Sequence, residues 1–346
     1  MPQYFTIHRK YKLLLCGCLV VSVFLVVIGL FYIHKQRKSH QNIFEIDEYD
    51  DDGVYNSRDI SVFLDVGLPK RVNPNHFKNN HVSTRMVPKI LVNGFRAIHM
   101  VDMTPDHTPG QVEDNFYKYL ELKEINCLDD RRLGHEHDGG WNVCFSPPLG
   151  FTMPCLIYSF GIGDDWGFED QVSKSHGCQV LAFDPSIHKD DHNRSNLIQF
   201  RNLGLGGVNE VTEKGWHLKT LKTHLKDRKH TNATIDYLKF DVEYYEWDCL
   251  QSMIWDQSIR NVKQLAFEIH TVEYFKQDMH ASKQDYMRMF KLLTQLELMN
   301  FKRFNYRKNP FGEFRSTVTG VKRSCCYELF YINMNLVDLK YVLYAS

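Results

Sequence analysis

Ionisable side chains stand at or directly after the ends of two apolar segments, residues 235–240 and 262–269. They are Asp241, Glu243, Glu268 and His270. If both segments are parallel strands of one sheet, their carboxyl ends meet at the edge where α/β proteins bind ligands. Carboxylates and an imidazole at such an edge can bind a cationic group or accept a proton from a nucleophile. Solvated strand-end carboxylates are the alternative, but the convergence of four ionisable groups favours a catalytic site made of these residues.

A second group of residues indicates a cofactor. Gly161 and Gly163 follow the apolar segment 155–160, and Asp184 ends the next one, 179–183. Glycines let the backbone turn tightly and approach a ligand, and an acid at the tip of the following strand accepts hydrogen bonds from ribose hydroxyls. Each feature alone is also found in ordinary turns. Together they predict a nucleoside-containing cofactor, for which both NAD and S-adenosylmethionine are candidates.

The elements that must position these residues alternate along the chain. Expected strands cover residues 155–160, 179–183, 197–201, 235–240 and 262–269, and expected helices cover residues 115–125, 164–176, 216–226, 246–254 and 284–300. Such alternation predicts an α/β fold whose mostly parallel sheet is covered on both faces. Two late strands, 301–306 and 327–333, have no helix between them. They predict a C-terminal antiparallel hairpin, which makes seven strands in all.

The N-terminal third has a different composition. Residues 13–33 carry no charge, and a helix of that length crosses about 30 Å of hydrocarbon. The run is longer than the apolar part of a cleaved signal peptide, which is the alternative, and no small-residue cleavage site follows it. We predict a short tail at 1–12, a transmembrane signal anchor in the lipid bilayer at 13–33, a stalk at 34–110 and a catalytic domain at 111–346.

Several features bear on the compartment. The sequons at Asn193 and Asn232 are usable only if the domain is translocated. Seven cysteines beyond the anchor favour an oxidising compartment. We therefore predict a single-pass type II protein, glycosylated at both sites, with its domain in the Golgi or secretory lumen or outside the cell. The 42 basic and 42 acidic side chains balance, so no nucleic-acid partner is expected.

The cysteine spacing allows two interpretations. Cys127 and Cys144 could form a disulfide, or could bind zinc together with His135 and His137. The spacing lacks the close Cys-x-x-Cys pair of structural zinc modules, so we predict the disulfide and no metal site. Cys155 and Cys178 could also pair with each other. The adjacent residues Cys325 and Cys326 are not expected to bridge.

Several motifs resemble known methyltransferases. Leu238-Lys239-Phe240-Asp241-Val242-Glu243 resembles the fourth-strand motif of FkbM-type methyltransferases. A wider similarity, from about residue 116 to 335, is to the methyltransferase-like protein 24 family. The segments that carry it are 138–141 (DGGW), 155–162 (CLIYSFGI), 166–169 (WGFE), 182–186 (AFDPS) and 326–333 (CYELFYIN).

This resemblance implies a Rossmann-like class I methyltransferase fold. It implies transfer of a methyl group from S-adenosylmethionine to an oxygen or nitrogen of an unknown acceptor, which could be a small molecule, a glycan or a protein. The cofactor would contact Gly161, Gly163, Glu169, Asp184, Asn202, Leu203 and Asp241, and the acceptor would lie toward Glu243, Glu268 and His270.

One departure from the class I pattern is visible. Many of these enzymes carry an acid two residues before the first glycine, where this chain has Ser159. Asp164, Asp165 or Glu169 could take its place. An inactive methyltransferase-fold scaffold that binds a partner at the membrane is the alternative function. A third possibility, an NAD oxidoreductase, is disfavoured by the terminal hairpin and by the acids after residue 240.

Overall fold

The computed structural model describes residues 90–92, 101–275, 279–338 and 342–344. The predicted anchor at 13–33 and most of the predicted stalk lie outside this range. Among the helices that are described, none combines the length and the apolar character needed to cross a bilayer.

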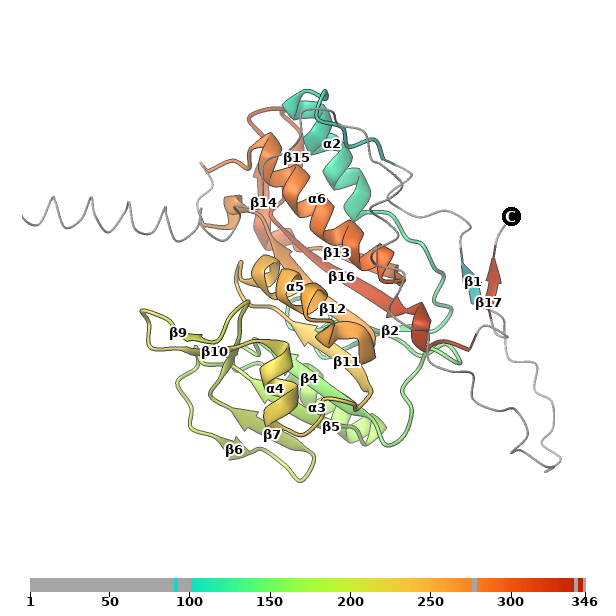
Figure 1. Ribbon diagram of the computed structural model, residues 1–346, viewed down its shortest axis with the longest axis vertical. Helices are drawn as coiled ribbons and strands as arrows, with labels where there is room; N and C mark the ends of the chain where they lie inside the picture. The colour runs from blue at the N-terminus through green and yellow to red at the C-terminus, as the bar shows by residue number, and fades with distance from the viewer. Residues whose placement is uncertain (1–89, 93–100, 276–278, 339–341, 345–346) are drawn as a thin grey trace, which may run out of the picture. The chain divides into compact units, whose positions relative to one another are not determined.

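A mixed sheet of eight strands forms the centre of the domain (Figure 1). Its strands are β4 (Leu156–Phe160), β5 (Gln179–Phe183), β6 (His192–Asn193), β7 (Ile198–Arg201), β11 (Ile235–Phe240), β12 (Val262–His270), β13 (Phe301–Lys308) and β16 (Cys326–Asn333). Across the sheet they follow the order β13-β16-β12-β11-β4-β5-β7-β6. The strands from β12 to β7 are parallel, whereas β16 runs antiparallel between β12 and β13.

The strand order confirms the predicted α/β fold and its C-terminal antiparallel hairpin. The two-residue strand β6, antiparallel to β7, extends the expected seven strands to eight. The chain runs outward from β4 through β5 and β7, then returns to place β11 on the other side of β4. The boundary between β4 and β11 is therefore the point where the strand order reverses, and open α/β sheets bind ligands at this point.

Four helices cover one face of the sheet. They are α2 (Pro109–Leu120), α4 (Leu221–Asp227), α5 (Glu246–Trp255) and α6 (Lys283–Leu298). Their apolar residues share one buried cluster with sheet residues such as Tyr158, Phe160 and Leu238. Capping boxes start two of these helices, Thr108 with Gln111 in α2 and Ser282 with Asp285 in α6.

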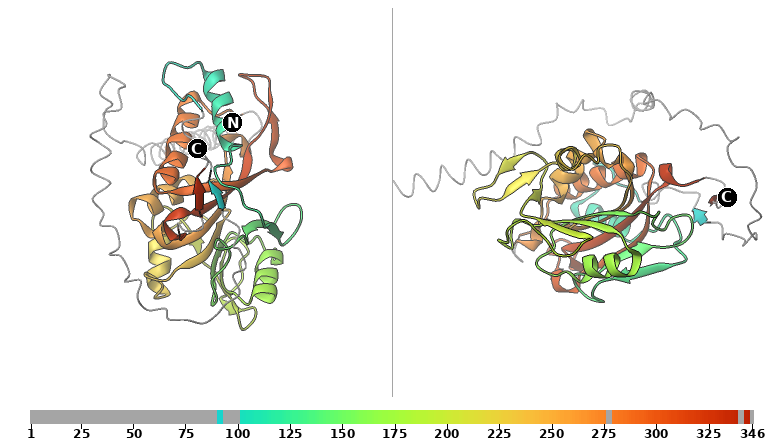
Figure 2. Two further views of the ribbon diagram at one scale, coloured as in Figure 1. Left: turned by 90° about the vertical axis from the view of Figure 1, so that its right-hand side faces the viewer. Right: turned by 90° about the horizontal axis from the view of Figure 1, so that it is seen from below.

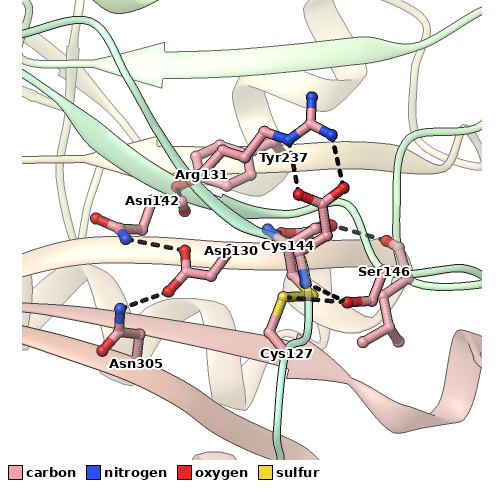
Figure 3. The surroundings of a disulfide bond; sticks show 11 residues. Cys127, Asp130, Arg131, Asn142, Cys144, Ser146, Tyr237 and Asn305 are labelled. Atoms are coloured by element: carbon pink, nitrogen blue, oxygen red, sulfur yellow. Dashed lines mark hydrogen bonds and ion pairs between the residues drawn. A yellow bond between two sulfur atoms is a disulfide. The ribbon is translucent and has the colours of Figure 1, made fainter.

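The opposite face is covered by α3 (Gly167–His176) and by a hairpin of β2 (Asp130–Leu133) and β3 (Trp141–Cys144). Figure 2 shows α3 in green on the side of the sheet away from the orange α6. The Cys127–Cys144 disulfide closes this hairpin (Figure 3). Hydrogen bonds from Tyr237 to Asn142 O (2.7 Å) and from Asn305 to Asp130 (2.6 Å) fasten it to the central sheet.

The remaining elements are short. They comprise β8 (Gly204–Leu205), β9 (Glu210–Val211) and β10 (His217–Lys219) in one small sheet, the pair β14 (Glu313–Arg315) and β15 (Lys322–Ser324), the pair β1 (Ile90–Val92) and β17 (Val342–Tyr344), and 3-10 turns at Ser258–Asn261, Val272–Tyr274, Pro310–Gly312 and Met334–Leu336.

Several expected boundaries were wrong. Residues 216–226 are not one helix, because β10 pairs with β8 and Thr220 then caps α4 with its side chain. The helix after the glycine turn starts at Gly167 rather than at 164. Asp164 has a positive φ of 63°, and Asp165 Oδ1 accepts a hydrogen bond from Gly167 N, so this acidic pair forms the turn before the helix. The helix expected at 115–125 begins earlier, at Pro109, and ends at Leu120.

The predicted disulfide Cys127–Cys144 is present, and Cys155 and Cys178, for which pairing was a possibility, also form a disulfide. Contrary to expectation, the structure also pairs the neighbouring residues Cys325 and Cys326. Cys249 is a buried free thiol.

Candidate functional site

The glycine turn joins the carboxyl ends of three strands. Gly161 follows β4 with a positive φ of 71°, and a Cβ atom there would lie 1.7 Å from Asp241 O. Gly161 N also donates to Phe183 O at the end of β5 (2.9 Å). Only glycine allows the ends of β4 and β11 to approach this closely. The predicted residues Gly161 and Asp241 are therefore in direct contact at the point where the strand order reverses.

Asp184 joins the same turn from β5. Its buried carboxylate accepts a hydrogen bond from Gly163 N at 2.9 Å and bonds from the backbone and side chain of Ser186 at 2.7 and 2.6 Å. The space where a Gly163 side chain would stand is open, with no atom within 4 Å of an added Cβ. A carboxylate oxygen has two lone pairs, so Asp184 can still accept a ligand hydroxyl beside this open position.

Ser159, which stands where many class I methyltransferases have an acid, contacts a buried acid from another element. Its hydroxyl donates to Glu169 Oε1 at 2.5 Å, and Lys239 Nζ lies 3.7 Å from the same oxygen. Lys239 also donates to Gly161 O at 3.0 Å. Glu169, in the first turn of α3, is fully buried, and its Oε2 has no hydrogen-bond partner among the described residues. Of the three acids that could replace the missing one, Glu169 is the one in contact with Ser159.

The two residues predicted near an adenine follow β7. Asn202 N donates to Asp191 Oδ1 at 2.8 Å, and Leu203 N donates to Arg201 O at 2.9 Å. Asp184 N bonds the same Arg201 carbonyl at 3.3 Å. Both residues are half-buried and lie at the same edge of the sheet as Asp184.

The four predicted catalytic residues lie at the ends of β11 and β12. One potential ligand atom each of Asp241, Glu243 and His270 lies within 4.8 Å of the others. The buried Glu268 accepts a hydrogen bond from Asn309 Nδ2 at 3.0 Å. Glu243 has an unusual positive φ of 56°, and so does Tyr244 at 79°. This left-handed turn follows Asp241 directly, and the Glu243 carboxylate lies 3.7 Å from His270 Nε2.

The crowding of acids changes the proton affinities in this cluster. Burial raises the pKa of Asp241 well above its ordinary value, and the nearby Glu268 carboxylate raises it further. Burial also raises the pKa of Glu268, to about 7, against the opposing effects of His270 and Asn309. Burial alone would lower the pKa of His270, but the carboxylates of Glu246, Asp241 and Glu268 raise it to about 10. The pKa of each of these groups therefore depends on the charge of its neighbours.

Sequence reasoning gave no role to four members of this site. Glu246, fully buried in the first turn of α5, accepts from Val242 N and lies 3.1 Å from His270 Nδ1. Asn309 reaches Glu268 from a loop 41 residues away. Lys239 bonds the glycine turn, and the ring of Tyr274 contacts that of His270 with centroids 4.6 Å apart. The position of Glu246 just after the acidic segment was the one available sequence signal.

A loop of the hairpin lies near the same edge. Arg132 forms a two-pronged ion pair with Glu328 (2.7 and 3.0 Å) and donates to the carbonyls of His135 and His137. His135 Nε2 in turn lies 3.2 Å from Asp165, in the turn before α3. Arg132 therefore ties the loop to the sheet, and His135 ties it to the turn before α3.

The strand order, the reversal point and the glycine–acid turn together define a Rossmann-like class I methyltransferase fold. The family model described as a methyltransferase domain matches residues 92–332. The chain therefore belongs to this family of methyltransferase domains.

Two relatives support the same assignment. The chain is 26% identical over 250 residues to a probable methyltransferase-like protein 24 of Rattus norvegicus, a match that covers 66% of this chain and 67% of the relative. It is 27% identical over 236 residues to the probable methyltransferase-like protein 24 of Homo sapiens, covering 63% of each. The chain thus aligns with about two thirds of the length of these relatives.

Proposed function

We propose that this methyltransferase uses S-adenosylmethionine and transfers its methyl group to an oxygen or nitrogen of an acceptor. One observation carries the proposal: the Gly161–Gly163 turn is bonded to Asp184 and touches Asp241 at the reversal point of the sheet. A nucleoside needs close approach to the backbone, which Gly163 allows at its open position, and an acid for its ribose, which Asp184 supplies beside it.

The residues present fit such a cofactor. Gly163 borders open space, and Asp184 has lone pairs left for a ribose hydroxyl. The buried Glu169 Oε2 has no hydrogen-bond partner among the described residues, and buried polar atoms are normally partnered. The ammonium group of the methionine part would supply the donor that this oxygen lacks. Asn202 and Leu203, after β7, would border the adenine.

When bound, the cofactor supplies an electrophilic methyl group. The protein would orient the nucleophilic atom of the acceptor and accept its proton. The residues for these roles are Asp241, Glu243, Glu268 and His270. Acceptors that this arrangement can serve include small molecules, glycans and protein side chains.

The test is calorimetric titration of the purified full chain with S-adenosylhomocysteine. We expect one binding site, and we expect Asp184→Asn to weaken binding at least about tenfold, because it replaces a charged hydrogen-bond acceptor. Asp227→Asn is the matched control, since this exposed acid at the end of α4 pairs with Lys219 of β10, outside the site. A folded wild-type protein that binds no S-adenosylhomocysteine would contradict the proposal and favour the inactive scaffold.

We further propose that residues 13–33 anchor the protein in a lipid bilayer as a type II protein whose domain faces the secretory lumen or the cell exterior. The uncharged run of 21 residues supports the anchor. Both sequon asparagines, Asn193 and Asn232, are exposed on the domain, as a glycan attachment site requires.

A further inference from the structure

The carboxyl ends of β11 and β12 carry a mixed set of metal-ligand groups. Asp241 and Glu243 offer carboxylate oxygens and His270 offers an imidazole nitrogen, and these three atoms lie within 4.8 Å of one another. Oxygen and nitrogen atoms that bind one divalent cation at 2.0–2.5 Å are at most about 4–5 Å apart. The three groups therefore need little movement to share an ion.

The imidazole is already held in the way that metal-binding histidines are held. His270 Nδ1 lies 3.1 Å from the buried Glu246 Oε1, while Nε2 faces Glu243 at 3.7 Å, which is too long for a hydrogen bond. Histidine ligands usually give one ring nitrogen to a carboxylate and the other to the metal. Glu246 thus leaves Nε2 as the nitrogen that faces the other two groups.

Two buried oxygens of this cluster are without a donor. Asp241 Oδ1 and Glu246 Oε2 are both buried and have no hydrogen-bond partner among the described residues. Glu246 is fully buried, and its other oxygen contacts His270. Buried carboxylate oxygens rarely remain unpaired. Four carboxylates, those of Asp241, Glu243, Glu246 and Glu268, share one imidazole, so the cluster has too little positive charge.

We propose that Asp241, Glu243 and His270 form a binding site for a divalent cation of the Mn²⁺ type, with Glu246 as the residue that positions His270. Carboxylate oxygens suit Mn²⁺, Mg²⁺ and Ca²⁺, and the imidazole favours Mn²⁺ among these. This revises the expectation from sequence that the chain has no metal site. The neighbouring group Glu268, His270 and Cys326 is not a second site, because Cys326 is paired with Cys325.

The ion would lie beside the glycine turn, where the acceptor of the proposed methyl transfer must bind. A divalent cation lowers the pKa of a bound hydroxyl group. If the proposed function holds, on which this step rests, the site favours an acceptor that presents a hydroxyl oxygen to the ion.

The site is tested by titrating chelator-treated full-length protein with MnCl₂ and measuring bound Mn²⁺ by electron paramagnetic resonance. We expect one bound ion per chain, and we expect Glu243→Gln to weaken binding at least about tenfold, since even the loss of an outer partner costs that much. Glu243 is exposed, with 60% of its side chain accessible, so this variant should fold. Glu313→Gln, the same change at an exposed ion-paired acid of β14, should bind Mn²⁺ like the wild type.

Glu246→Gln tests the positioning role. It should weaken Mn²⁺ binding and broaden the resonance of the bound ion, whereas a purely structural role would lower only the melting temperature. The proposal is overturned if folded wild-type protein binds no ion stoichiometrically, or if Glu243→Gln binds as tightly as Glu313→Gln.

Titration with S-adenosylhomocysteine separates this proposal from the proposed function. We expect the cofactor product to bind with or without Mn²⁺ and to leave the ion in place. Mutual exclusion of the two ligands would assign the unpaired oxygens to the cofactor and would refute a separate metal site. Binding of S-adenosylhomocysteine without any Mn²⁺ site would refute the metal proposal alone.

Discussion

The close contact between the ends of β4 and β11 depends on the absence of a Cβ atom at Gly161. Alanine variants of Gly161 and Gly163 test this. In Gly161→Ala the new Cβ would meet Asp241 O at 1.7 Å, whereas in Gly163→Ala it would meet nothing within 4 Å. Both glycines have a positive φ, which costs alanine about 1 kcal/mol. We expect Gly163→Ala to lose about that amount of unfolding free energy in urea, and Gly161→Ala to lose about 3 kcal/mol or more. Equal losses would mean that the contact between β4 and β11 does not need glycine.

A buried histidine should make stability depend on pH. Burial lowers the pKa of His224 to about 4, with smaller effects from its hydrogen bond to Gly204 O and from Lys219, Asp227 and Arg228. The unfolded chain has the ordinary pKa of about 6.5 and binds the proton first. The contribution of His224 to the unfolding free energy therefore has its full value above pH 6.5 and is lost as the pH falls toward 4.

Urea unfolding at pH 7 and pH 5 measures the effect of His224. Between pH 7 and pH 5, protonation of His224 should lower the unfolding free energy of the wild type by about 2 kcal/mol. His224→Asn lacks this contribution, so its unfolding free energy should fall by about 2 kcal/mol less than that of the wild type over the same interval. His217→Gln, at an exposed histidine of β10, should keep the wild-type pH dependence. An unchanged dependence in His224→Asn would show that the imidazole is not the group responsible.

At the scale of elements, the ion pair of Arg132 with Glu328 is one of the contacts that fix the hairpin β2–β3 to the sheet. Arg132→Met would remove the ion pair with the buried Glu328 and the bonds to His135 O and His137 O. Glu328 would keep Arg307 as a partner at 2.7 Å, so the expected loss of unfolding free energy is about 2–3 kcal/mol, at the low end for a broken buried pair. The neighbouring Arg131→Met removes an exposed pair with Asp129 and should change stability little. Similar unfolding curves for both variants would contradict this account.

The elements also show how far sequence reasoning reaches. β5 and β11 were predicted to the residue, because both segments are rich in apolar and aromatic residues and each ends directly before an aspartate, Asp184 or Asp241. The segment 216–226 was misjudged because Leu218, Leu221 and Leu225 have helical spacing, although Leu218 belongs to a strand paired with Gly204. Such pairing with a distant segment leaves no local signal. For the same reason Asn309 and Glu246 could not be assigned to Glu268 and His270 before the structure placed them together.

At the scale of the whole molecule, topology brings the site together. The predicted residues come from the ends of β4, β5, β7, β11 and β12, five strands spread over more than a hundred residues. Parallel strands with crossover connections place all of their carboxyl ends at one edge. The alternation of strands and helices in the sequence was therefore enough to predict that these residues meet. It was not enough to predict which acids would be buried without a partner, because burial depends on how α5 and the hairpin pack on the sheet.

The whole chain also makes a prediction about topology in the membrane. If the segment at 13–33 is a type II anchor, the domain is translocated and both exposed sequons, Asn193 and Asn232, can receive glycans. We expect the full chain made in mammalian cells to lose mass in two steps on partial digestion with an N-glycosidase. Asn193→Gln and Asn232→Gln should each remove one step, and Asn202→Gln, which lies outside a sequon, should remove none. A membrane-bound chain of unchanged mass after digestion would instead place the methyltransferase domain on the cytosolic side, where the three disulfides of the structure would be hard to maintain.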